Sequence, residues 1–316
     1  MVIVVLLLSG CYVRRGWPLP GGKGYIVGVH TYGTAGPVQI QQSDLARIPL
    51  GPGHEQFIPC AGFPGTLGSS VYDWHRDRYY CWHVTEEGLT TGSGTAQIVS
   101  LHGSTGEFEA LCQMKYRRLH GVDMDISPDG RYLLLSTEEA LYRYDLPDGG
   151  LTRLSDPAYC ASFGAPCILP DGTVYVPGAF AHNELYALNP ETGAIALVCR
   201  LEESIVGISP DGRLCATLDG NRTGIVRLPG GEAATELKVE GLNKILRSAW
   251  GWPEATLTFV GPRQLAYIRE YDWWWTLPVE GIHIYDLKTG KEHLLRRGSW
   301  WPMWYMPPAR DHTQEE

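Results

Sequence analysis

Short runs of alternating apolar and polar residues recur along the chain, and glycine-containing turns separate them. Period-two alternation is typical of strands with one buried face, and no stretch shows the sustained 3.6-residue period of an amphipathic helix. Three turns share a Pro-Asp-Gly core, at 127–131, 169–173 and 209–213, and a degenerate copy lies at 75–78. Proline presets φ and Asp-Gly supplies a tight reversal, so each turn is predicted to join two antiparallel strands.

A second series of turns ends in glycine, and each is flanked by an alternating strand and a further apolar strand. These glycines stand at positions 106, 149, 193, 231 and 290. In the first series, Asp129, Asp171 and Asp211 are 42 and 40 residues apart. A four-stranded unit of about 40–45 residues is the blade of a β-propeller, and blades must stack because one blade cannot bury both of its faces. The chain is therefore predicted to be an all-β propeller.

The repeats predict six four-stranded blades, with seven as the alternative, in a single domain over residues 23–308. Five blades are expected near 63–114, 115–157, 158–203, 204–243 and 244–299. The N-terminal blade should have strands at 25–30, 38–42 and 55–60, without a Pro-Asp-Gly turn. Residues 301–308 resemble the inner strand that this blade lacks. We expect them to complete it and close the ring, which removes free sheet edges. Residues 309–316 should form a polar tail.

The Ser-Pro-Asp-Gly-Arg turns and the Tyr-Asp-Leu-Lys-Thr-Gly turn that ends at Gly290 resemble those of TolB-like and WD40-like propeller repeats. The resemblance covers most of residues 63–299. It implies the architecture, and by analogy with TolB-like proteins a periplasmic scaffold. It identifies no partner, because propellers serve many functions.

The N-terminus carries a candidate targeting signal. Residues 1–10 form an apolar segment similar to the core of a secretory signal peptide, too short to cross a bilayer as a helix. Leu8-Ser9-Gly10-Cys11 resembles a bacterial lipobox, which implies cleavage before Cys11 and lipidation of its thiol. Residues 11–22 would then be a linker. No Lys or Arg follows Met1, so a buried strand and an ordinary signal peptide remain alternatives.

Composition narrows the range of partners. The chain has 316 residues and a formal net charge of −9, with no basic run longer than a pair. Neutralisation of phosphates supplies most non-specific affinity for nucleic acids, so we expect no nucleic-acid binding. We also expect a monomer whose only membrane attachment is a lipid anchor.

The eight cysteines do not suggest a metal site or a full disulfide set. No Cys-x-x-Cys occurs, and seven cysteines remain if Cys11 is lipidated. Cys81 and Cys215 occupy the same position in two repeats, where a third repeat has Leu133, and Cys112 and Cys199 share another repeated position. Positions that accept either cysteine or leucine are typical of small core residues. A disulfide between Cys160 and Cys167 remains an alternative if the protein occupies an oxidising compartment.

No known catalytic motif is present, so we predict no catalytic residues, metal or cofactor. His75 and His83 flank one predicted hairpin, where solvated or core histidines are favoured over metal ligands. Asp123 and Asp125 alternate on a predicted inner strand and could both face the central channel. The corresponding positions on other inner strands, at or beside Cys167, Ser209 and Val260, supply little matching chemistry.

The tryptophans are unevenly distributed along the chain. Eight of the 11 fall between residues 250 and 304. Most are expected on inter-blade connections and one middle hairpin, which open on the same face of a propeller; Trp300 and Trp301 are assigned to a connection. Clustered indoles bind sugars, prolines and cations, although packing between blades is the plainer interpretation. The candidate binding residues are Trp250, Trp252, Tyr271, Asp272, Trp273, Trp274, Trp275, Trp300 and Trp301.

These observations favour a non-enzymatic propeller lipoprotein of the bacterial cell envelope. It would bind an envelope protein or a glycan through the aromatic-rich face, at the periplasm or the outer surface. Two alternatives remain. One is a propeller enzyme (a lyase, lactonase or glycan-active hydrolase) at the channel mouth, and the other is a soluble cytoplasmic interaction module.

Overall fold

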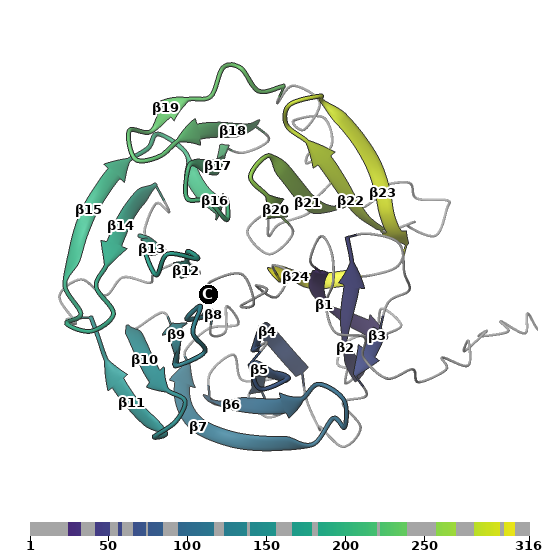
Figure 1. Cartoon of the computed structure of the whole chain (residues 1–316), viewed down its shortest axis with the longest axis vertical. Helices are drawn as coiled ribbons and strands as arrows, with labels where there is room; N and C mark the ends of the chain where they lie inside the picture. The colour runs from purple at the N-terminus through teal and green to yellow at the C-terminus, as the bar shows by residue number, and fades with distance from the viewer. Residues whose placement is uncertain are drawn as a thin grey trace, which may run out of the picture.

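The computed structural model describes most of the predicted strands and many of the turns between them. The residues described are 25–32, 42–50, 56–58, 66–73, 75–84, 94–116, 123–137, 140–155, 166–178, 183–219, 222–238, 257–269, 281–297 and 300–306. Among these residues every regular element is a β-strand, and no helix is long and apolar enough to cross a membrane. The predicted all-β propeller is confirmed (Figure 1).

Five blades each consist of four consecutive antiparallel strands, with the first strand innermost. The first contains β4 (Thr66–Asp73), β5 (Arg78–Val84), β6 (Gly94–His102) and β7 (Phe108–Tyr116). The second contains β8 (Asp123–Ile126), β9 (Tyr132–Ser136), β10 (Leu141–Asp145) and β11 (Gly150–Arg153). The third contains β12 (Cys167–Ile168), β13 (Val174–Pro177), β14 (Glu184–Leu188) and β15 (Ile195–Arg200). The fourth contains β16 (Ser204–Ile208), β17 (Leu214–Asp219), β18 (Arg222–Arg227) and β19 (Glu232–Ala233). The fifth contains β20 (Leu257–Gly261), β21 (Gln264–Arg269), β22 (Gly281–Asp286) and β23 (Lys291–Arg297).

The prediction of six blades is wrong, because only these five blades are each built from four consecutive strands of the chain. A further four-stranded sheet, in the order β24-β1-β2-β3, combines both ends of the chain: β24 (Trp300–Met306), β1 (Tyr25–Tyr32), β2 (Gln42–Pro49) and β3 (Gln56–Ile58). Strand β24 pairs antiparallel with β1 from Tyr25↔Met306 to His30↔Trp300, which closes the ring. The seven-blade alternative is wrong, and the strand expected at 38–42 lies instead at 42–49.

The glycines of both turn series have positive φ. The second series, at positions 106, 149, 193, 231 and 290, has φ between 69° and 72°. Side chains disfavour this left-handed region because Cβ approaches the following carbonyl oxygen. In the degenerate turn Asp77 takes the left-handed conformation, with φ of 50°, at the place of Gly130 rather than that of Asp129. Aspartate is among the few residues that tolerate this conformation.

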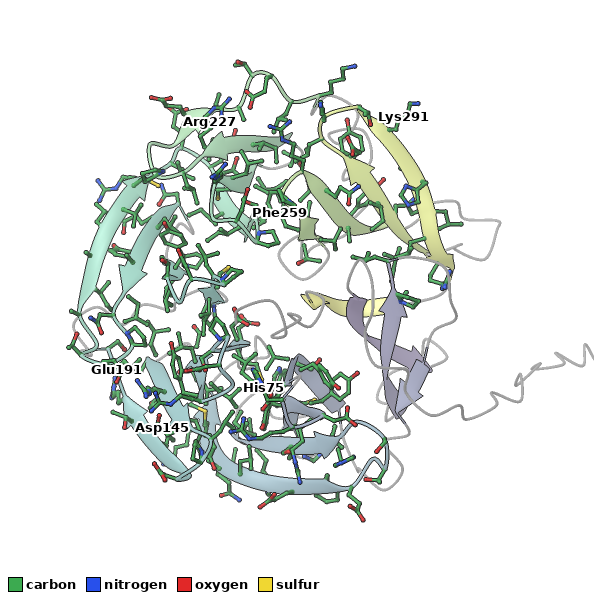
Figure 2. The ribbon with its side chains drawn as sticks, viewed as in Figure 1. His75, Asp145, Glu191, Arg227, Phe259 and Lys291 are labelled. Atoms are coloured by element: carbon green, nitrogen blue, oxygen red, sulfur yellow. The ribbon has the colours of Figure 1, made fainter. Side chains whose placement is uncertain are left out.

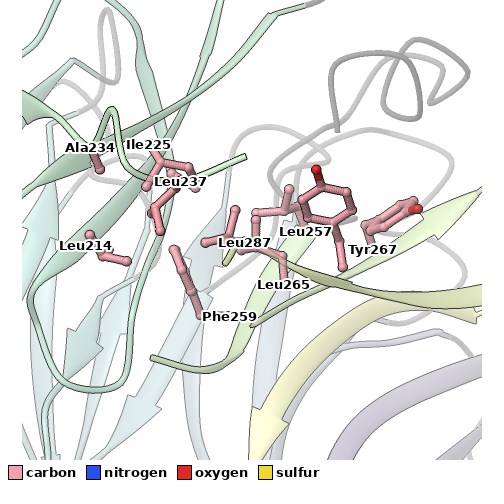
Figure 3. Close-up of a cluster of buried hydrophobic side chains, with 11 residues drawn as sticks. Leu214, Ile225, Ala234, Leu237, Leu257, Phe259, Leu265, Tyr267 and Leu287 are labelled. Atoms are coloured by element: carbon pink, nitrogen blue, oxygen red, sulfur yellow. The ribbon is translucent and has the colours of Figure 1, made fainter. Parts of the chain in front are cut away.

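The hydrophobic core is divided into clusters that lie between neighbouring blades. One cluster joins Leu214, Ala216 and Ile225 of the fourth blade to Leu257, Phe259, Leu265 and Tyr267 of the fifth (Figure 3). Similar clusters join the first blade to the second, the second to the third and the third to the fourth. Ile48 of β2 packs with Ala266 and Ile284, which joins the composite sheet to the fifth blade. Each blade therefore buries its faces only in the presence of its neighbours.

Candidate functional site

The innermost strands surround the propeller axis (Figure 1). The carboxyl group of Asp125 on one of them links two blades. Asp125 lies on β8, and its Oδ2 accepts a hydrogen bond from the backbone N–H of Ile168 on β12 at 2.6 Å. Its Oδ1 accepts from the N–H of Ile126 at 2.8 Å. Both carboxyl oxygens are therefore engaged by backbone groups, one of them across the boundary between the second and third blades.

The surroundings of Asp125 favour the neutral forms of the ionisable groups near it. Burial raises the pKa of Asp125 to about 7, although the N–H groups of Ile168 and Ile126 act in the opposite direction. Burial also raises the pKa of the Cys167 thiol, and the neighbouring Asp125 carboxylate adds to that shift. A thiol whose pKa is raised has little thiolate at neutral pH and is a poor nucleophile.

The other inner positions considered from sequence have structural roles. The Ser209 hydroxyl is buried in its turn, where it donates to Asp211 Oδ1 at 2.7 Å and accepts from the Leu214 N–H at 2.8 Å. Val260 is buried in the hydrophobic core. Asp123 lies two residues before Asp125 and is partly exposed. These positions therefore bring no acid–base pair to Asp125.

The two histidines of the first blade lie in different environments. His75 is exposed, with its Nε2 3.2 Å from the carbonyl oxygen of Pro128, whereas His83 is buried on β5. Across the described ranges, no three His, Cys, Asp or Glu side chains are grouped closely enough to hold a metal ion.

The cysteines that the structure describes, Cys167 among them, are free thiols. Cys160, the other half of the possible disulfide, lies outside the described residues. Cys81 and Cys215 are buried, as the core interpretation of the repeated positions predicts, while Cys112 and Cys199 are partly buried. Cys11 lies outside the described residues, and its lipidation stays a prediction.

A polar clasp between the first two blades was not anticipated from sequence. Asp73, at the end of β4, is buried, and its Oδ2 accepts from Arg76 Nη1 at 2.7 Å. The same nitrogen donates to the carbonyl oxygen of Gly130 in the next blade at 2.6 Å. The Asp-x-x-Arg spacing just before the degenerate turn is the signal that could have identified it (Figure 2 labels the adjacent His75).

Most of the predicted aromatic face lies outside the described residues, namely Trp250, Trp252, Tyr271, Asp272, Trp273, Trp274 and Trp275. Trp300 and Trp301 are placed differently from the prediction. They are the first residues of β24, paired with β1, and not part of an inter-blade connection. They were misassigned because the closing strand begins three residues after β23 ends at Arg297.

A groove lies between the fourth and fifth blades, with a volume of about 1040 Å³. Its lining includes Leu201, Ile225, Leu237 and Tyr285, together with the charged residues Arg200, Glu202, Glu203 and Lys238. The Glu203 carboxylate accepts a hydrogen bond from Thr217 Oγ1. Because this polar pair is satisfied within the protein, the groove offers no distinctive chemistry from which to name a ligand.

Comparisons with known proteins support the fold. No protein-family model matches the chain. No curated protein matches it either. In structure it is similar to a chain of a nidogen/laminin complex, with a TM-score of 0.54 and 11% identity over 90% of this chain and 99% of that one. A chain assigned as TolB from Agrobacterium tumefaciens gives a TM-score of 0.43 and 12% identity, over 90% of this chain and 87% of that one. At these identities the first likeness shows the propeller fold alone, and the second is too weak to add to it.

Proposed function

We propose that this chain is a non-enzymatic binding propeller of the bacterial cell envelope, anchored by lipid at Cys11. It contacts an envelope protein or a glycan through an aromatic-rich face. That face comprises Trp250, Trp252, Tyr271, Asp272, Trp273, Trp274, Trp275, Trp300 and Trp301.

The direction of the strands in the fifth blade is the observation that carries this proposal. Consecutive strands are antiparallel, so the start of β20 at Leu257, the end of β21 at Arg269 and the start of β22 at Gly281 share one face of the ring. Strand β23 ends at that face, and β24 begins there at Trp300. The sequence segments that carry the other tryptophans join these strand ends. Indoles grouped at one face supply the rigid apolar contacts typical of binding hot spots.

The binding face is tested by photo-crosslinking in bacteria that express the chain from its own start. A photoreactive phenylalanine analogue replaces Trp274, and in a matched variant it replaces Lys288. Lys288 is exposed on the turn between β22 and β23, at the opposite face. We expect a discrete adduct with an envelope protein or glycan from position 274 and none from position 288. Equal labelling from both positions, or none from 274, would refute the aromatic face.

The anchor is tested separately by intact mass and membrane fractionation. The parent chain should lose residues 1–10, gain acyl chains and sediment with membranes, whereas Cys11→Ala should be unacylated and absent from the membrane fraction. If the two proteins fractionate alike, the lipid anchor is wrong. If both are found in the soluble fraction, the binding face belongs to a soluble module.

A further inference from the structure

The outermost strands of the blades form the rim of the propeller (Figure 1). The sequence of β15 differs from those of the longer rim strands. It carries five consecutive apolar residues, Ile195–Cys199, before Arg200. The longer rim strands have charges within their length, Glu109 and Lys115 in β7 and Glu292 and Arg296 in β23. Charges on edge strands oppose unwanted pairing with other chains. Strand β15 lacks this protection until its last residue.

Two adjacent apolar side chains of β15 are exposed, while Ile195, Val198 and Cys199 are partly buried. Leu197 is 52% exposed, more than Leu294 of β23 at 42%, and Ala196 is exposed beside it. The strand lies at the end of the order β12-β13-β14-β15, so its outer edge has no neighbouring strand among the residues the structure describes.

The backbone of β15 also presents hydrogen-bonding groups outward. The Ala194 carbonyl oxygen accepts from the Asn189 N–H at 2.8 Å, which directs Ala194 toward β14. Hydrogen-bonding direction alternates along an antiparallel strand, so the N–H and C=O groups of Ile195 and Leu197 point away from β14. The register shifts after Leu197, so the regular outward edge ends there. An apolar strand with outward-facing backbone groups is a template for an additional strand.

The charges around this edge are predominantly acidic. Arg200 is already paired with Glu184. Near the start of β15, the Glu191 carboxylate lies 2.5 Å from the Arg143 guanidinium. Arg143 also pairs with Asp145, so these three side chains together carry a net negative charge. Glu191 is labelled in Figure 2 and its side chain is 70% exposed. Glu202, just beyond β15, is exposed as well.

We propose that the outer edge of β15 is a docking site for an extended segment of a partner protein that adds as a fifth strand to the third blade. The segment is apolar at alternate positions and carries positive charge at its ends. A second copy of this chain is disfavoured as the occupant, because it would bring the same acidic edge against this one in a protein of net charge −9. This site lies on the rim and is independent of the proposed aromatic face.

The test is hydrogen–deuterium exchange of the full chain with a capped probe peptide, Lys-Val-Thr-Val-Thr-Val-Lys. The same peptide with glutamate in place of each lysine is the charge control. We expect the lysine peptide to slow exchange at Ile195 and Leu197, and the glutamate peptide to leave it unchanged. Protection should be lost in Leu197→Lys and retained in Leu294→Lys, the matched change on the rim of another blade.

Three results would overturn the proposal. The first is no protection of β15 by the lysine peptide. The second is equal protection by both peptides. The third is protection that appears without peptide as the protein concentration rises and disappears in Leu197→Lys, since it would identify a second copy as the occupant.

Discussion

At the scale of single residues, turn geometry and the partly buried carboxyl group of Asp125 make the most specific demands on side-chain identity. Left-handed glycines lie in both series of turns, and Asp77 shows that aspartate can take the place of one between two inner strands. Asp125 is the described carboxyl whose pKa is most clearly raised, and it lies where two inner strands meet.

The requirement for a left-handed turn residue is tested at two adjacent glycines. Gly149 has φ of 70°, and a Cβ there would meet nothing closer than the Tyr144 hydroxyl at 3.5 Å, so the cost of Gly149→Ala is conformational rather than steric. We expect a loss of about 1–2 kcal/mol in the free energy of unfolding. Gly150→Ala, whose Cβ would meet nothing within 4 Å, should change it by less than about 0.5 kcal/mol. Urea melts of both variants measure the difference, and equal losses would contradict this account of the turn.

The raised pKa of Asp125 predicts a pH dependence of stability. Its folded-state pKa of about 7 exceeds the ordinary 3.8, so between these values the folded state binds more protons than the unfolded state. The contribution of this group is therefore fully present below about pH 4 and is lost as pH rises through about 7. Asp125→Asn removes this titration. Relative to the variant, the parent protein should lose stability from pH 5 to pH 8, by at most about 1.4 kcal/mol per pH unit. Parallel stability curves in urea melts would show that Asp125 titrates normally.

At the scale of elements, the blades are joined by apolar clusters and by polar contacts between neighbouring turns. The Asp73–Arg76 pair is the clearest such contact, because Arg76 reaches the Gly130 carbonyl oxygen of the next blade. Burial raises the pKa of the adjacent Tyr80 to about 12, and the Asp73 carboxylate contributes to the shift. Tyr80 therefore remains a neutral hydroxyl that can donate to Asp73, 3.4 Å away.

Removing Arg76 should destabilise the boundary between the first two blades. Arg76→Ala leaves the Asp73 carboxylate buried without its cation, while Arg76 itself is 39% exposed, so the expected loss is about 1–3 kcal/mol. Arg227→Ala is the matched control, because its pair with Glu236 is exposed on both sides and is worth about 0–1 kcal/mol. Thermal melts compare the two, and a similar effect of both would show that the clasp acts as an ordinary surface ion pair.

At the scale of the whole molecule, the ring depends on pairing between the two ends of the chain. Strand β24 supplies the inner strand for β1, and Ile48 of the same sheet packs on the fifth blade. Without β24, the inner edge of β1 has no partner strand, and this sheet lacks the strand that faces the propeller axis.

Shortening the chain tests the closure. A chain ending at residue 299 loses the seven residues of β24, and we expect its melting temperature to fall by about 10 °C or more, with aggregation through the open edge. A chain ending at residue 308 loses only residues 309–316 and should melt like the parent. If both melt alike, the pairing of β24 with β1 contributes little to stability.

The local pattern of the sequence determined the all-β class, the turns and four-strand blades of roughly the observed extent. This was possible because the Pro-Asp-Gly turns, the left-handed glycines and period-two alternation act within a few residues of one another. The end-to-end closure was also predictable, since the N-terminal blade lacked an inner strand that the C-terminal segment resembled. The exact start of β24 was missed, because alternation does not mark where a connection ends and a strand begins.

Contacts between blades were decided only by the tertiary structure. The bond from Ile168 to Asp125 spans 43 residues and the bond from Arg76 to Gly130 spans 54, and no short-range pattern encodes either. The same is true of the exposure of β15. Its apolar run resembles a core strand in the sequence, and only its place at the outer edge of a blade makes it a surface. Burial and pKa depend on which distant strands are neighbours, and that arrangement is set by the packing of the whole ring.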